Sequence, residues 1–206
     1  MTTRRSNRRQ KQAAATRQDI LAAARRLFAT RGYVATSMSA IAEEAETAVQ
    51  TIYDSVGPKR AIILAMVDMS EAEAGVDEFR QRIGQTRNPR EAIALFVALT
   101  RGFMEHGGDV FLAMMSAAPI EQDVAEAWQH ANRNHRFGAR MVGELLARLD
   151  ALAPGVSVDR AGDVIAVLTW GATWQQFLRD HGWSLDECER WLNQTLVTLL
   201  LRDTTD

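Results

Sequence analysis

Hydroxyl and carboxamide side chains gather in one stretch of the sequence. Thr36, Ser37 and Thr47 each precede a segment with helical hydrophobic spacing, so we expect them at helix N-termini. Hydroxyls and backbone N–H groups at such positions suit phosphate oxygens. Gln50 carries a carboxamide, which can contact an adenine base edge through two hydrogen bonds. The chemistry that these residues favour is therefore binding of a nucleic acid.

Rigid elements must hold these side chains, and the hydrophobic spacing predicts that the elements are helices. A first helix begins at Ala13 and ends at Arg31-Gly32, where glycine suits the left-handed conformation of a helix C-terminus. A second, short helix follows Ser37 as its N-cap. Thr47-x-x-Gln50 fits a capping box, which predicts the start of a third helix near Thr47.

The apolar residues of the two short helices predict how these helices pack. The second helix has its apolar positions at Met38, Ile41, Ala42 and Ala45. The third helix has an inward side of Val49, Ile52 and Val56, which leaves other faces to Gln50, Thr51, Tyr53 and Asp54. Two short helices braced by a first one form a helix-turn-helix, whose second helix can enter the major groove of DNA. The alternative is an ordinary corner between helices.

Charge is divided unequally along the chain. The whole sequence has a net charge of −2, but residues 1–60 hold eleven basic and five acidic residues and carry +6, which leaves −8 for the rest. A basic segment at the predicted helix-turn-helix favours a nucleic-acid partner. Residues 1–12 carry five positive charges and no acidic residue. We expect a disordered basic arm there, which follows phosphates or enters the minor groove, or alternatively a solubilising tail.

Residues 17–64 resemble the DNA-binding domain of tetracycline-repressor-like (TetR family) transcriptional regulators. The matching features keep the family's spacing without a gap: Ile20-Leu21, Ala23-Ala24, Leu27-Phe28, Arg31-Gly32-Tyr33, Thr36-Ser37-Met38, Ile41-Ala42, Ala45, Thr51-Ile52-Tyr53, and Lys59 before Ala61. Four residues depart from the pattern. Glu46 and Thr47 stand where glycine and valine are usual, and Asp54 and Val56 stand where a basic or polar residue and an aromatic residue are usual.

The resemblance implies further roles in the predicted DNA-binding surface. It implies that Thr51, Tyr53 and Lys59 hold the phosphate backbone. Tyr53 could also pack against the start of the next helix. Val49, or Ala48 beside it, could touch the methyl group of thymine. Glu46 and Asp54 place carboxylates near the expected phosphate surface and so could alter which sequence is bound and how tightly.

Beyond residue 57 the hydrophobic spacing predicts helices only. We expect a long helix over Pro58–Ile83, another opened by Asn88-Pro89, a turn at Gly107-Gly108, a short segment Val110–Ala117, and helices near Glu121–Leu152, Val158–Asp180 and Ser184–Leu201. The sequence therefore predicts an all-α protein. Its parts are a basic arm at 1–12, a three-helix DNA-binding domain at 13–57, and a larger helical bundle for ligand binding and dimerisation at 58–206.

Aromatic, methionine, histidine and asparagine side chains in the second part favour a small-molecule site between bundle helices. The candidate effector-binding residues are Phe103, His106, Phe111, Met115, Trp128, Asn132, His135, Trp170 and Trp174. Most of the apolar members could equally belong to the core, so the polar members are the more informative candidates. The expected effector is moderately hydrophobic and uncharged or weakly charged.

Apolar stripes in the last two helices predict a homodimer interface, which the resemblance also implies. One stripe is Leu185, Cys188, Leu192, Leu196 and Leu199; apolar and small residues of the preceding helix are Val164, Leu168 and Gly171-Ala172. The alternative is that both stripes serve the core of the monomer. A dimer would place two recognition helices on the half-sites of a pseudo-palindrome.

Several classes of protein are disfavoured. The longest apolar run, Ala92–Leu99, is far shorter than the roughly 20 residues that span a bilayer, so we expect no membrane partner. The single cysteine, Cys188, fits a reducing cytoplasm. His130 and His135 are wrongly spaced for a metal site, and we expect no metal and no cofactor. No nucleophile–base pair is recognisable, so we expect no enzyme and no catalytic residues.

Together these observations predict a ligand-responsive transcriptional regulator of the cytoplasm. It would bind a double-stranded DNA operator as a homodimer, as a repressor, and respond to a small-molecule effector. The alternative is a helical small-molecule-binding or interaction protein whose helix-turn-helix no longer binds DNA.

Overall fold

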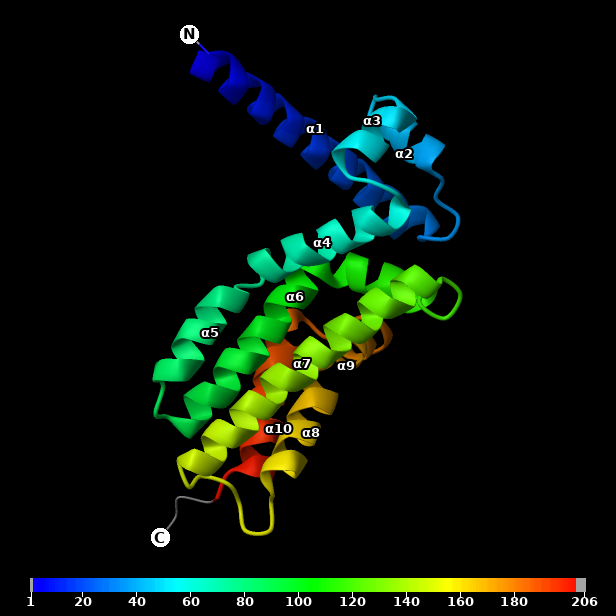
Figure 1. The fold of residues 1–206 in the computed structure, drawn as a ribbon. Coiled ribbons are helices and arrows are strands. Elements are labelled where there is room, and N and C mark those ends of the chain that lie inside the picture. Colours follow the sequence, from blue (N-terminus) through cyan, green and yellow to red (C-terminus); the bar gives the residue numbers. More distant parts are fainter. Residues whose placement is uncertain (1, 203–206) are drawn as a thin grey trace. The chain divides into compact units, whose positions relative to one another are not determined.

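The computed structural model describes residues 2–202 of the 206-residue chain, with side chains for residue 8 and residues 10–202. Its helices are α1 Thr2–Arg31, α2 Met38–Glu44, α3 Val49–Ser55, α4 Lys59–Glu73, α5 Val76–Gln85, α6 Pro89–Ala117, α7 Gln122–Arg148, α8 Val158–Thr169, α9 Gly171–Gln175, the π-helix η1 Gln176–Asp180, and α10 Leu185–Leu200 (Figure 1). Over the described residues, regular structure is helical apart from an isolated antiparallel bridge between Leu152 and Leu201. The predicted all-α class is confirmed.

The chain folds into two compact units. The N-terminal unit consists of the residues up to Met69 together with Asp109–Trp128, and the bundle unit consists of Ser70–Gly108 and the residues from Gln129 onward. Helices α4, α6 and α7 each contribute residues to both units. These units do not coincide with the DNA-binding and ligand-binding domains predicted to meet at residue 57. Those domains were predicted by function, and their division stays a prediction.

The N-terminal unit packs α2 and α3 beside α1 (Figure 1). Ile20, Ile41 and Ile52, one from each of these helices, are fully buried in a common core. Gly32 has a φ of +79°, so α1 ends in the left-handed conformation predicted for this glycine. The inward sides predicted for the two short helices are confirmed.

Helix α1 begins earlier than the sequence analysis predicts. It runs from Thr2 rather than from Ala13, so the backbone of the expected disordered arm is helical from residue 2 onward. The arm contains no glycine or proline, and its arginine, glutamine and lysine residues have high helix propensity. Extending an existing helix also avoids the unfavourable nucleation step. Helical structure in the arm is therefore physically consistent with its sequence.

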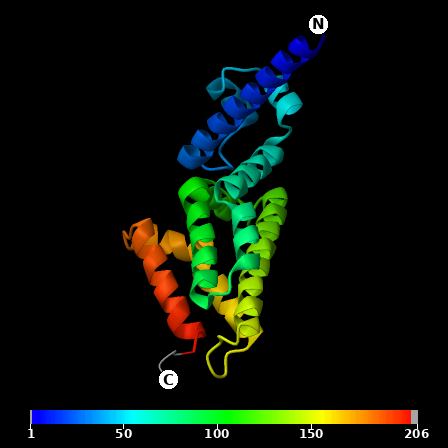
Figure 2. The same cartoon turned by 90° about the vertical axis from the view of Figure 1, so that its left-hand side faces the viewer.

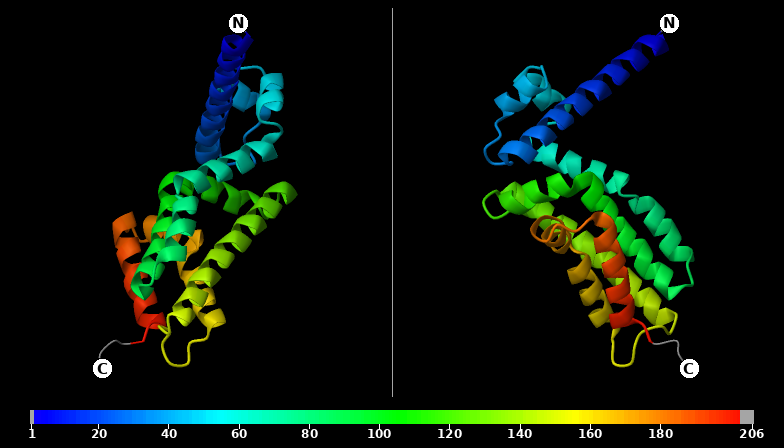
Figure 3. Two further views of the ribbon diagram at one scale, coloured as in Figure 1. Left: turned by 60° about the vertical axis from the view of Figure 1, so that its left-hand side comes forward. Right: turned by 180° about the vertical axis from the view of Figure 1, so that it is seen from behind.

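The bundle unit forms around a second core. α5, α6 and α7 lie side by side (Figure 2), where the ring of Phe96 on α6 is 5.6 Å from that of Phe79 on α5 and 5.4 Å from that of His135 on α7. α10 lies next to α8 (Figure 3). The largest fully buried side chains of this unit are Trp174, Phe96, Ile93, Leu146, Ile165, Leu192 and Leu196.

Two glycine-containing segments differ from the predictions. The single helix expected over Pro58–Ile83 is broken at Gly75, which has a φ of +83° and separates α4 from α5. The turn expected at Gly107-Gly108 is wrong, because α6 continues through both glycines. A Cβ atom at Gly107 would lie 2.6 Å from Ser70 Oγ, so this glycine permits close packing of α6 against α4.

The C-terminal helices differ from the prediction in one place. The helix expected over Val158–Asp180 is divided into α8, α9 and η1, with Trp170 in an extended conformation between the first two. α10 begins with the capping box of Ser184 and Glu187. Within residues 2–202, none of the helices combines the length and apolar character needed to cross a membrane.

Candidate nucleic-acid interface and effector site

The turn between α2 and α3 is closed by backbone hydrogen bonds. The Glu46 N–H donates to Glu43 O at 3.1 Å, and the Thr47 N–H donates to Ala42 O at 2.9 Å. Glu46 has a φ of +49°, a left-handed conformation that favours glycine and strains other residues. Its side chain is exposed. The residue that departs from the TetR-family pattern therefore keeps the backbone geometry of a glycine and adds a carboxylate to the turn.

Only one of the two predicted N-caps forms. The Ser37 hydroxyl accepts from the Ala40 N–H at 3.1 Å and caps α2, as predicted. The predicted capping box of Thr47 is wrong, because Ala48 is the N-cap of α3 and makes no side-chain bond to the helix. Since α3 starts one residue later, Thr47 belongs to the turn, where its N–H bonds to Ala42 O. Ser37 is exposed, and its hydroxyl keeps a proton for a phosphate oxygen.

Thr36 is part of the interior of the N-terminal unit. Its side chain is 1% exposed, and its hydroxyl donates to Gly32 O at 2.8 Å. Its N–H donates to Tyr33 O at 3.2 Å. Both of its donors are therefore occupied by the loop between α1 and α2, and in this conformation Thr36 holds the loop rather than offering a donor to phosphate.

Lys59, at the start of α4, binds the same loop. Its ammonium group donates to Tyr33 O at 2.8 Å and Thr36 O at 3.0 Å, with Val34 O at 3.5 Å. It also lies 4.2 Å from the centre of the Tyr33 ring, within cation–π range. Burial lowers the pKa of Lys59 from its usual value. These contacts make Lys59 a clamp on the loop, whereas the resemblance implies a phosphate contact.

Tyr33 is held in the same place by burial. Burial first, and then the nearby carboxylates of Glu121 and Asp123, raise the pKa of Tyr33 to about 12. Its phenol therefore stays neutral at physiological pH. The Tyr33 ring also contacts Phe28, with a centroid distance of 5.0 Å.

Helix α3 presents an outer face of polar side chains. Gln50 and Asp54 are exposed, and Tyr53 is 47% exposed. The Gln50 Nε2 donates to Asp54 Oδ1 at 2.9 Å. The remaining predicted contact residues of this segment are Ala48, which is exposed, and Thr51 and Val49, which are half-buried. Val49 packs against the core, so only part of its side chain can reach a thymine methyl group.

Three arginines of α1 have partners within the N-terminal unit. Arg25 forms a two-bond ion pair with Asp109, at 2.7 and 2.8 Å. Arg17 donates to Ser55 O at 2.9 Å, and Arg26 pairs with Glu44 at 2.8 Å. The sequence does not predict these partners because they lie on other helices. They reduce the positive charge that α1 can offer to DNA.

The nine candidate effector residues do not gather in one unit. Phe111, Met115 and Trp128 belong to the N-terminal unit, where the rings of Phe111 and Trp128 are 4.9 Å apart. The other six lie in the bundle unit: Phe103, His106, Asn132, His135, Trp170 and Trp174. The candidates are divided in this way because α6 and α7 each contribute residues to both units, and their assignment to an effector site stays a prediction.

His135 is the centre of a polar and aromatic cluster in the bundle unit. Its Nε2 is 2.9 Å from Ala166 O and 3.3 Å from Thr169 Oγ1, and its ring is 5.0 Å from that of Trp170. Because a carbonyl oxygen only accepts, Nε2 must carry the proton. Burial lowers the pKa of His135, which favours the neutral ring. Thr169 is a partner that the sequence does not single out, although it directly precedes Trp170.

Trp174 leaves a hydrogen-bond donor unused in the same unit. Its side chain is fully buried, and its indole Nε1 has no hydrogen-bond partner among the described residues. Leaving such a buried donor without an acceptor is unfavourable by about 1–3 kcal/mol. Asn132 and Phe103 are half-buried and His106 is exposed. In this unit, Trp174 is thus a fully buried candidate with a free donor, and half-buried His135 and Trp170 form a polar and aromatic cluster.

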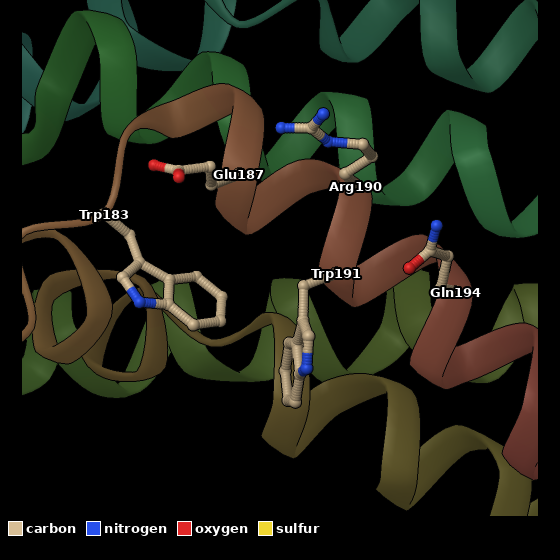
Figure 4. A pocket seen from close by; sticks show the side chains of 5 residues that line it. All are labelled: Trp183, Glu187, Arg190, Trp191 and Gln194. Atoms are coloured by element: carbon tan, nitrogen blue, oxygen red, sulfur yellow. The ribbon is translucent and has the colours of Figure 1, made fainter.

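A surface pocket lies on α10 and involves none of the predicted effector residues. It has a volume of about 230 Å³ and is lined by Trp183, Glu187, Arg190, Trp191 and Gln194 (Figure 4). The rings of Trp183 and Trp191 meet nearly edge to face with centroids 6.0 Å apart, which leaves no room for a ligand between them. The two indoles pack on Phe177, at 4.4 and 5.0 Å.

The leucine stripe assigned to the dimer interface lies mainly inside the chain's own core. Cys188, Leu192 and Leu196 are fully buried in the bundle unit, so their assignment to an interface is wrong. Leu199, on the same helix, is 50% exposed, and Val167 on the neighbouring α8 is 68% exposed. Apolar periodicity shows which residues share a face, but it cannot show whether the face is covered by the same chain.

The geometry of α1–α3 and the outer face of α3 define a helix-turn-helix protein, and comparisons with known proteins give its class. Residues 20–66 match the family model described as "Bacterial regulatory proteins, tetR family". Comparison with curated protein sequences gives no match. Residues 20–66 are thus similar to the N-terminal, DNA-binding domain of tetR-family transcription regulators.

Solved structures extend the likeness to the whole fold. NalD of Pseudomonas aeruginosa, the secondary repressor of the MexAB-OprM multidrug efflux pump, is 19% identical with a TM-score of 0.77, over 92% of this chain and 99% of that one. The SmeT–triclosan complex is 17% identical with a TM-score of 0.77, over 92% and 93%. A candidate transcriptional regulator from Saccharomonospora viridis in complex with choline is 20% identical with a TM-score of 0.74, over 92% and 100%. These identities support a common fold, and the TetR resemblance is confirmed.

Proposed function

We propose that this protein is a homodimeric repressor that binds a pseudo-palindromic DNA operator and responds to a small-molecule effector. The observation that carries the proposal is the exposed face of Gln50 and Tyr53 on the second helix of a tetR-family helix-turn-helix. Such a helix can enter the major groove, and Ser37 at the start of α2 can meet a phosphate. The work of the protein is binding rather than catalysis, and it belongs in the cytoplasm, where bacterial DNA lies.

Dimerisation is the part of the proposal that would double the recognition surface. Two recognition helices on a two-fold axis would read half-sites about 34–36 Å apart. Val167 on α8 and Leu199 on α10 are exposed apolar side chains on neighbouring helices. We assign the dimer contact to the outer faces of these helices, in place of the buried leucine stripe.

The effector site fits the bundle unit. Trp174 Nε1 offers an unused donor, and neutral His135 with a proton on Nε2 has its Nδ1 as an acceptor. A moderately hydrophobic molecule with one hydrogen-bond acceptor and one donor would meet both groups. Complexes with triclosan and choline among the similar structures support small-molecule binding by proteins of this fold.

The response to effector would be a shift between two conformations of the dimer. In one conformation the separation of the two recognition helices would not match the spacing of the half-sites. An effector that prefers this conformation weakens DNA binding, and DNA must weaken effector binding by the same factor. Lys59 offers a physical link, because it begins α4 and holds the loop in front of α2. A displacement of α4 would therefore be passed to the helix-turn-helix.

Selection from a random double-stranded DNA library tests the proposal. The full-length protein should enrich an inverted repeat, bind it as two chains per duplex, and lose affinity steeply as salt rises. Gln50→Ala should weaken this binding and relax its sequence preference, whereas Gln122→Ala, a change at an exposed residue of α7, should not.

Two outcomes would contradict this proposal. Enrichment of no sequence would favour the alternative of a helical ligand-binding protein that has lost DNA binding. Glu46 in the turn and Asp54 on α3 are the observations in favour of that alternative, because both carboxylates would lie near phosphates. Binding as a single chain to a non-repeated site would remove the dimer from the proposal.

A further inference from the structure

The polar face of α3 contains an internal contact one helical turn long. Gln50 Nε2 donates to Asp54 Oδ1 at 2.9 Å, and both side chains are exposed on the face that would meet DNA. Pairs four residues apart are neighbours on a helix surface, and glutamine–aspartate hydrogen bonds are among those that form there. The two residues therefore act as one recognition unit rather than as two independent side chains.

The helix under this pair is held firmly. Ile52 is fully buried beneath it, and Arg17 of α1 donates to Ser55 O at 2.9 Å, at the C-terminal end of α3. A fixed helix with a fixed side-chain pair presents a defined hydrogen-bond pattern before DNA arrives. Such preorganisation strengthens recognition because less side-chain freedom is lost on binding.

The chemistry of the pair decides which way the Gln50 amide points. A carboxylate only accepts hydrogen bonds, so Gln50 must turn its NH2 group, and not its carbonyl oxygen, toward Asp54. One of the two N–H bonds is then occupied. One N–H and the carbonyl oxygen remain, so the free edge of Gln50 offers one donor and one acceptor.

This free edge matches adenine and mismatches guanine. Adenine presents N7 as acceptor and the N6 amino group as donor in the major groove, which a single donor and a single acceptor satisfy. Guanine presents two acceptors, N7 and O6. With one N–H occupied by Asp54, Gln50 cannot donate to both, and its carbonyl oxygen would face O6.

We propose that Asp54 is a positioning residue that orients Gln50 to select adenine against guanine in each half-site. The inference rests on the proposed DNA-binding function and deepens it, because it names a base that the operator must contain. Asp54 acts through Gln50 and touches no base itself. A residue that departs from the family pattern thus becomes a determinant of specificity.

The test measures base preference at one position of the DNA. The wild-type full-length protein selects a duplex from a random library, and fluorescence anisotropy then compares that duplex with single adenine-to-guanine variants. We expect one adenine per half-site whose replacement by guanine weakens binding, with a ratio of the two affinities of about ten or more. Asp54→Ala should reduce this adenine-to-guanine ratio about twofold, the size expected for a pair on a helix surface, and Gln50→Ala should abolish it, while thermal melting of both variants stays near wild type.

Asp54→Asn is the matched control. Its side-chain oxygen can still accept from Gln50 Nε2, although the negative charge is gone, so we expect a ratio between those of the wild type and Asp54→Ala. A ratio unchanged in Asp54→Ala but lost in Gln50→Ala would overturn the positioning role and leave the DNA-binding function intact. A wild-type protein that selects no sequence would instead overturn the proposed function itself.

Discussion

The two units of this protein differ in whether every buried polar atom of their described side chains has a hydrogen-bond partner. In the N-terminal unit, Thr36, Lys59 and Arg17 bond to backbone carbonyl oxygens of loops and helix ends. In the bundle unit, the buried Trp174 Nε1 has no hydrogen-bond partner within the part of the chain that the structure describes. The N-terminal unit therefore has a preorganised surface, whereas the bundle unit keeps a donor that a bound molecule could satisfy. The difference agrees with a rigid DNA-reading part and a ligand-responsive part.

The largest expected effect comes from the core of the bundle unit. Leu192→Ala should lower the free energy of unfolding by about 2–5 kcal/mol, because it removes a fully buried side chain and leaves a cavity. Leu199→Ala, on the same helix but 50% exposed, should change it by about 0.5 kcal/mol or less at a protein concentration where the chain is monomeric.

Urea denaturation measures the free energy of unfolding of both variants. Sedimentation measures whether Leu199 contributes to the dimer contact. Leu199→Ala should shift the monomer–dimer equilibrium toward monomer if the outer faces of α8 and α10 form the dimer contact. Equal unfolding free energies for the two variants would show that the leucine stripe does not belong to the core.

The next effect tests the clamp in the N-terminal unit. Lys59→Met should destabilise the protein by about 1.5–3 kcal/mol, because charged hydrogen bonds to Tyr33 O and Thr36 O are lost. Operator affinity should fall, while the slope of log affinity against log salt should stay the same. Arg60→Met, which breaks an exposed ion pair with Asp123 at 3.3 Å, serves as a control and should cost about 1 kcal/mol or less.

The salt slope separates the two roles of Lys59. A loss of about 0.9 in the slope would mean that the ammonium group neutralises a phosphate, as the family resemblance implies. The contrast between the two units would then be smaller, because the Lys59 ammonium group would contact DNA rather than only the loop of its own unit.

A pH dependence tests the buried polar group of the other unit. Burial lowers the pKa of His135 in the folded state, so below the unfolded value of about 6.5 the unfolded chain binds a proton that the folded chain does not. Stability should therefore fall as pH drops below about 6.5, by at most about 1.4 kcal/mol per pH unit, until the folded pKa is passed.

The difference between wild type and His135→Gln isolates this contribution from that of the carboxylates. The slope between pH 6.5 and 5 should be smaller in His135→Gln, and His130→Gln, a change at an exposed histidine, should keep the wild-type slope. Identical slopes in all three proteins would mean that His135 is not protonated on unfolding in this range.

The smallest expected effect concerns the strained turn. Glu46→Gly should stabilise the protein by up to about 1 kcal/mol, because relief of left-handed strain exceeds the added freedom of the unfolded chain. Operator affinity should rise as well, since a carboxylate leaves the turn. Asp150→Gly, at a φ of +54° in the bundle unit, should stabilise similarly without changing DNA affinity. A lower melting temperature for Glu46→Gly would mean that the glutamate side chain contributes more than its backbone strain costs.

Local features of the fold could be predicted from the sequence, and long-range ones could not. The end of α1 at Gly32, the cap at Ser37 and the inward side of α3 at Ile52 depend on residues within one helical turn. The candidate site was predicted as a stretch of residues, and Gln50 and Tyr53 do lie on its exposed face. The hydrogen bond from Gln50 to Asp54 could have been found from their spacing of four residues.

The sequence by itself determined that the chain is helical, because periodicity and capping act over a few residues. It also determined that residues 20–66 match the tetR-family model. Only the tertiary structure decided that Lys59 binds a loop 23–26 residues earlier, that Arg25 pairs with Asp109, and that α6 continues through Gly107. It also decided that Leu192 is core while Leu199 is surface. These outcomes depend on which distant segment covers a side chain, and hydrophobic spacing along one helix does not contain that information.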